Sequence, residues 1–149
     1  MFNFFKKKRE NKIQNPKKFD FDNELTASIL AYEVARSDGD ISEDELNVLY
    51  KEIKKISKKV TKSDASIFKI IEQFSQSSVS FYEFIEDINK NYSKEDKLSL
   101  IKFLWQVAYA DKVLKVNEER LIRRIADLIK IKDIDVLKLK HISKNSNNQ

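Results

Sequence analysis

The chain has 149 residues, of which 36% are charged, and it contains one Gly, one Pro, one His and no Cys. Phosphate loops, dinucleotide-binding turns and nucleophile elbows need glycines at sharp bends, so a single glycine excludes these enzyme motifs. Without Cys there is no disulfide, thiolate nucleophile or zinc ribbon, and one His cannot supply a multi-histidine metal site. We therefore expect one folded domain that is not an enzyme.

The net charge of +5 is concentrated at the N-terminal end of the chain. Residues 1–18 contain seven basic side chains and one acidic side chain, so this segment carries +6 and the remainder carries −1. A nucleic-acid-binding domain needs a basic surface to neutralise phosphates, and the near-neutral body offers none, so we expect no nucleic-acid partner. The sequence has no signal-peptide pattern and no apolar stretch long enough to span a membrane, which makes a cytoplasmic location the expectation.

Residues 1–20 lack helical periodicity and contain Pro16, so we expect a flexible basic tail there. Three aromatic side chains and a four-residue basic run mark its start: Phe2, Phe4, Phe5, Lys6, Lys7, Lys8 and Arg9. A solvated tail is one interpretation. The other is peripheral contact with the anionic inner membrane surface, where the Phe side chains insert and each basic side chain contributes about 1 kcal/mol.

From residue 21 onward, apolar residues recur every three or four positions, which predicts helices. The first is expected over 24–37, and Ser42-Glu43-Asp44-Glu45 is a capping box that begins the second. Further helices are expected over 64–76, 80–91, 94–110, 116–130 and 133–142, followed by a polar tail over 143–149. The predicted fold is all-α, a single bundle of about seven helices over residues 21–142.

Two helix–loop–helix segments resemble each other at an offset of 73 residues. In each segment a helix ends near an Asp, a short loop contains one aliphatic residue, and the next helix begins near a Glu. The aligned pairs include Val34 with Val107, Asp38 with Asp111, Ile41 with Leu114, Glu45 with Glu118 and Leu49 with Ile122. Two related hairpins predict a bundle with pseudo-two-fold symmetry, in which each hairpin covers the apolar face of the other.

Acidic side chains crowd the first of these loops, from Asp38 to Glu45. Acids in the first turn of a helix favour the positive end of its dipole, which is the ordinary explanation. Asp38 instead follows a helix end, where carbonyl oxygens already present negative charge, so a hard cation such as Ca²⁺ or Mg²⁺ is the second explanation. The candidate ligands are Asp38 and Glu45, with Asp40 and Ser42 as auxiliary ligands and Asp111 and Glu118 as counterparts in the second loop.

The chain resembles the tellurite-resistance TerB family, especially small bacterial proteins that consist of this domain alone. The resemblance covers about residues 24–142 and rests on ARSDGDISEDE (35–45), LWQVAYAD (104–111) and EERLIRRIADL (118–128). It implies a bundle of about seven helices with acidic loop residues that bind a divalent metal, and it implies no defined reaction. Lys112 and Lys115 depart from the family pattern, which usually has Gly and a polar or acidic residue there, and an ammonium group opposes a second cation.

We therefore expect a non-enzymatic TerB-like module that binds a divalent cation at the 38–45 loop. Its role would be in stress response to tellurite or metal ions, through contact with an unidentified protein partner or a membrane. The alternative is a metal-free adaptor that the tail docks to the inner membrane surface. Hydrolysis by paired carboxylates would require an acid and a base across a cleft, and nothing in the sequence arranges such a pair.

Overall fold

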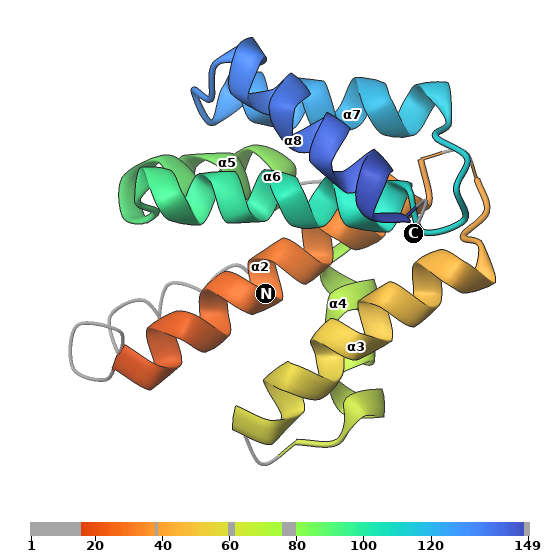
Figure 1. Ribbon diagram of the computed structural model, residues 1–149. Coiled ribbons are helices and arrows are strands. Elements are labelled where there is room, and N and C mark those ends of the chain that lie inside the picture. The colour runs from red at the N-terminus through yellow and green to blue at the C-terminus, as the bar shows by residue number, and fades with distance from the viewer. Residues whose placement is uncertain (1–15, 38, 60–61, 76–79, 148–149) are drawn as a thin grey trace.

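A computed structural model describes residues 16–37, 39–59, 62–75 and 80–147 of the chain. These residues form seven helices and no strand, so the all-α prediction is confirmed (Figure 1). The helices are α2 (Pro16–Ala35), α3 (Glu43–Lys59), α4 (Asp64–Ser75), α5 (Ser80–Asn91), α6 (Lys94–Ala108), α7 (Val116–Leu128) and α8 (Asp133–Asn147). None of these described helices is long and apolar enough to cross a membrane.

Two helices extend beyond their predicted ends. α2 begins at Pro16, within the segment that we expected to be a tail. Proline is compatible with this position, because its fixed φ suits the first helical turn and its missing N–H is not needed there. α8 continues to Asn147 rather than ending at residue 142, and Ser143 in its last turns is buried.

The two predicted hairpins, α2–α3 and α6–α7, have corresponding ends. α2 ends at Ala35 and α6 at Ala108, which are the residues that the 73-residue offset aligns. α3 begins at Glu43 and α7 at Val116, again an aligned pair. The internal repeat that the sequence predicts is therefore a repeat of structure.

The loops of the two hairpins also share their backbone geometry. Gly39 has a φ of +100°, and the aligned Lys112 has a φ of +65°. The Gly39 N–H donates to the carbonyl of Arg36 at 2.8 Å, and the Lys112 N–H donates to the carbonyl of Tyr109 at 2.9 Å. Because left-handed φ values suit glycine, Lys112 holds a conformation that a side chain makes costly.

The hydrophobic core lies where the two hairpins cross. α2 packs against α6, while α2 also contacts α7 and α3 contacts α6 (Figure 1). α4 then packs on α2 and α3, and α8 packs on α6 and α7, so each hairpin has a covering helix. Fully buried side chains from both hairpins meet in this core, among them Leu25, Ile29, Leu49, Ile53, Leu104, Trp105, Ile122 and Ile125.

Ile122→Ala should destabilise the bundle far more than Ile134→Ala. Ile122 is fully buried, so its truncation removes packing and leaves a cavity, at a cost of about 2–5 kcal/mol. The side chain of Ile134 is 61% exposed, and its truncation should change the free energy of unfolding by no more than about 0.5 kcal/mol. Urea unfolding of both variants checks this difference, and equal losses would contradict the helix packing described above.

Candidate functional site

Glu45 and Glu118, which the repeat aligns, lie against each other at the crossing of the two hairpins. Glu45 belongs to the first turn of α3 and Glu118 to the first turn of α7. Both residues are fully buried, with an exposed fraction of 0%. Two glutamates with no exposed surface are rare in a protein of this size, because burial of a carboxylate is costly unless something compensates its charge.

One oxygen of each carboxyl group is held by the backbone at the start of its own helix. The Ser42 N–H donates to Glu45 Oε1 at 2.9 Å, and the Lys115 N–H donates to Glu118 Oε1 at 3.2 Å. Ser42 Oγ accepts from the Glu45 N–H at 3.1 Å, which confirms the capping box predicted for α3. These bonds hold each side chain in place and direct its second oxygen elsewhere.

The second oxygen, Oε2, of each glutamate is buried and finds no N–H or hydroxyl donor among the described residues. The two carboxyl groups are neighbours, and Glu45 acts on the pKa of Glu118. Two carboxylates have only acceptors, so neither group can satisfy the other's Oε2 unless one of them carries a proton.

The pKa of Glu118 is raised from 4.5 to about 9. Burial is the largest cause of this rise, and the neighbouring carboxyl group of Glu45 is the second. The backbone N–H of Lys115 and its charge act in the opposite direction and lower this pKa. At neutral pH the pair therefore keeps one proton unless another positive charge replaces it.

The other predicted ligands have different positions and partners. Asp40 is exposed, and Ser42 Oγ is engaged by the backbone of Glu45. Asp111 Oδ1 accepts from the backbone N–H two residues further on, at 3.1 Å, and so closes its own loop. Asp38 lies outside the described residues, and among those that are described no three acidic or histidine side chains gather as ligands of one metal ion.

The residues predicted to contact a membrane, 2–9, also lie outside the described part of the chain. The adaptor that docks through this tail therefore remains a prediction from the sequence. No contact of the described bundle bears on it.

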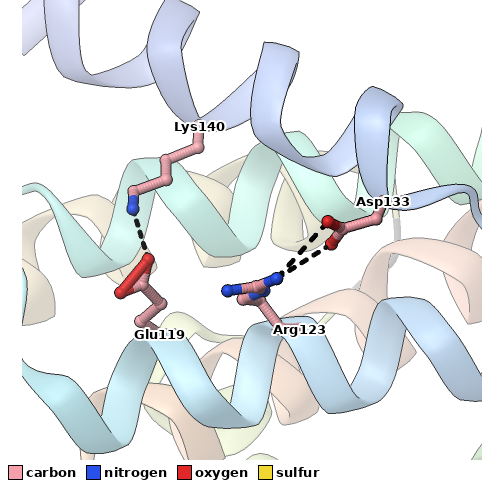
Figure 2. Close-up of polar contacts among 4 residues, drawn as sticks. All are labelled: Glu119, Arg123, Asp133 and Lys140. Carbon is pink, nitrogen blue, oxygen red and sulfur yellow. Dashed lines mark hydrogen bonds and ion pairs between the residues drawn. The ribbon is translucent and has the colours of Figure 1, made fainter.

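A second polar group, which the sequence did not indicate, joins α7 to α8 (Figure 2). Arg123 pairs with Asp133 at 3.2 Å, and Lys140 pairs with Glu119. The partners lie 10 and 21 residues apart, so no helical spacing could have related them. All four side chains are at least partly exposed, and we assign them the structural task of holding α8 on α7.

Comparison with protein families finds a match to the family described as tellurite resistance protein TerB, over residues 24–141. The matched segment includes both buried glutamates and both hairpins, except residues 16–23 of α2. Searches of curated proteins and of solved structures find no match.

Glu118→Gln should remove a pH dependence from the stability of the bundle. The pKa of Glu118 is higher in the folded chain than in the unfolded chain, so the stabilisation is complete below pH 4.5 and is lost as the pH rises towards 9. The loss reaches at most about 1.4 kcal/mol per pH unit. Gln has no proton to lose and can donate to Glu45, so in urea unfolding the variant should gain on wild type as the pH rises from about 6 to about 8.

Glu119→Gln is the matched control for this measurement. Glu119 is the next residue of α7, but its side chain is partly exposed and paired with Lys140. This variant should keep the wild-type slope of stability against pH. Equal slopes in wild type and Glu118→Gln would show that the buried pair holds no proton.

Proposed function

Because this chain belongs to the TerB family of tellurite resistance proteins, we propose that it is a non-enzymatic module whose Glu45–Glu118 pair binds a divalent cation, Ca²⁺ or Mg²⁺. Cation binding would serve a stress response to tellurite or metal ions through contact with a protein partner or a membrane. The observation that carries the proposal is the pair of buried Oε2 atoms, which lack any donor except each other's carboxyl group.

The chemistry of this pair suits a hard cation. Ca²⁺ and Mg²⁺ take oxygen ligands, and carboxylates are prominent among them. Two ionised carboxylates would bring two negative charges into a buried position, where each is costly without compensation. A proton neutralises only one of these charges, whereas a divalent cation neutralises both. Water, loop carbonyl groups and Asp38 are the candidates for the remaining ligands.

Burial of the pair favours binding over catalysis. Both glutamates have an exposed fraction of 0%, so a substrate could not reach them in the closed bundle. A small cation needs only a brief local opening, and it can then stay between the two carboxylates. This difference in access supports a binding module rather than a hydrolase.

A cation at this position would tie the two hairpins together. Glu45 belongs to α3 and Glu118 to α7, and these helices belong to different hairpins. The unfolded chain lacks the paired arrangement, so a cation that binds the pair must stabilise the folded state. We propose that the partner of this module recognises the bundle in this more rigid, cation-bound form.

Millimolar CaCl₂ or MgCl₂ should raise the melting temperature of the full-length protein at slightly alkaline pH. A ligand at one hundred times its Kd adds about 2.7 kcal/mol, which corresponds to several degrees in a domain of this size. Thermal unfolding followed by circular dichroism measures the shift against the same buffer with EDTA.

The double variant Glu45→Gln, Glu118→Gln should show no such shift, although it folds without metal. Asp44→Asn is the matched control, because Asp44 is an exposed acid in the same first turn of α3, and this variant should keep the wild-type shift. Absence of a shift in wild type, or equal shifts in wild type and double variant, would contradict the cation site.

A further inference from the structure

Exposed apolar side chains gather in the last third of the described chain. Seven large hydrophobic residues are exposed among the described residues, and five of them lie between residues 113 and 142: Val113, Val116, Ile134, Leu137 and Ile142. The two others, Tyr50 and Tyr82, carry a polar hydroxyl group that suits an exposed position. Ile134, Leu137 and Ile142 line one groove, and aliphatic residues gathered on one surface indicate contact with another apolar body.

α8 contributes three of these five residues and is apolar on two of its sides. Its inner side packs against α6 and α7 and buries Val136 and Ser143. Its outer side presents Ile134, Leu137 and Ile142, with exposed fractions of 61%, 43% and 49%. A helix needs only one apolar stripe to pack on a bundle, so the fold does not account for the outer stripe.

Basic side chains accompany the outer stripe, and no Asp or Glu lines its groove. Lys138 and His141 line the same shallow groove as Ile134, Leu137 and Ile142. Asp133, in the first turn of α8, pairs with Arg123 of α7 (Figure 2). The outer face of α8 thus combines aliphatic and positively charged groups.

A cavity of about 510 Å³ continues this face at the C-terminal half of α8. Leu137 and His141 line both the cavity and the groove, so the two are one surface. Three lysines also line the cavity, namely Lys112 from the α6–α7 loop and Lys140 and Lys144 from α8. No Asp or Glu side chain is among its lining residues.

Two of these three lysines have their charge available for an external anion. Lys140 is engaged by Glu119, and its Nζ lies 5.7 Å from the centroid of the Trp105 ring. Lys112 and Lys144 are exposed and form no ion pair with the described residues. Their ammonium groups therefore keep the positive potential of the cavity uncompensated.

Lys112 belongs to the loop between α6 and α7 and has a left-handed backbone conformation. Lys112 has a φ of +65°, in the left-handed region that Gly39 occupies at the aligned position of the first hairpin. A lysine there is strained where a glycine would not be. Lys130 has the same φ, and Lys112 differs from it in that it lines the cavity.

We propose that the outer face of α8, with the adjoining lysine-lined cavity, docks this protein on an anionic lipid bilayer. Lys112 and Lys144 contact phosphodiester headgroups at the cavity, and Ile134, Leu137 and Ile142 enter the interfacial layer. An anionic bilayer supplies both negative charge and an apolar layer beneath it. A second copy of the chain would bring like charges together, and a free phosphate ion would leave the aliphatic stripe uncovered.

Cosedimentation of the full-length protein with lipid vesicles, in EDTA, tests this surface. The protein should bind vesicles of equal parts phosphatidylglycerol and phosphatidylcholine, should not bind pure phosphatidylcholine, and should be released by high salt. Lys112→Gln, Lys144→Gln should weaken binding about 25-fold, since each lysine near an anionic surface contributes about fivefold. Ile134→Gln, Ile142→Gln should weaken it by about tenfold or more, because the apolar insertion is lost.

Lys54→Gln, Lys58→Gln is the charge-matched control, because both lysines are exposed on α3, and it should bind nearly as wild type does. The tail variant Lys6→Gln, Lys7→Gln, Lys8→Gln separates this surface from the basic tail, and in this background the α8 substitutions should still reduce binding. All substituted α8 residues are exposed, so circular dichroism melts should confirm intact folds.

Several results would overturn the proposal. The first is wild-type protein that stays in the supernatant. The second is an equal loss of binding in the α3 lysine variant and in Lys112→Gln, Lys144→Gln. The third is an Ile134→Gln, Ile142→Gln variant that binds as wild type does. A wild-type dimer in analytical ultracentrifugation that this isoleucine variant abolishes would assign the face to a second copy instead. Saturable binding of inorganic phosphate without vesicle binding would assign the cavity to a free anion. The vesicle experiment contains EDTA, so a negative result there does not contradict the cation site. The melting experiments with Ca²⁺ or Mg²⁺ contain no lipid, so a negative result there does not contradict the α8 surface.

Discussion

Two carboxyl groups meet where the hairpins of this bundle cross, and the need to compensate their buried charge constrains the rest of the structure. Each glutamate accepts a backbone hydrogen bond at the start of its own helix through one oxygen, and its other oxygen is buried without a donor. Two ionised carboxylates cannot share this position without a positive charge between them. The fold must therefore hold either a proton or a cation at the point where its two halves join.

Local patterns in the sequence predicted most of the helices, because apolar periodicity and capping boxes depend on residues within one or two turns. The 73-residue offset also predicted that Glu45 and Glu118 are equivalent. Their contact could not be predicted in this way, because it depends on how α2 crosses α6. The prediction from sequence placed a separate metal site at each acidic loop. It therefore included Asp40, which is exposed, and Asp111, whose side chain accepts a hydrogen bond within its own loop.

The ends of helices and the links between them required the tertiary structure. Polar residues after 142 predicted a tail, yet the burial of Ser143 against the bundle keeps α8 helical as far as Asn147. The ion pairs between α7 and α8 join residues that no helical spacing relates. They could be identified only from the packing of the two helices. The outer face of α8 was likewise hidden, because a single amphipathic pattern cannot show that a helix is apolar on two sides.

The most direct measurement of the buried pair is a pH titration of side-chain carboxyl carbons by NMR, with Glu119, the partly exposed next residue of α7, as the reference. In metal-free protein we predict that one carboxyl group of the Glu45–Glu118 pair stays protonated above neutral pH, and that Ca²⁺ displaces this proton at constant pH. If both groups instead lose their protons in the same acidic range as Glu119, with or without Ca²⁺, the pair holds neither a proton nor a cation at neutral pH and our account of the bundle is contradicted.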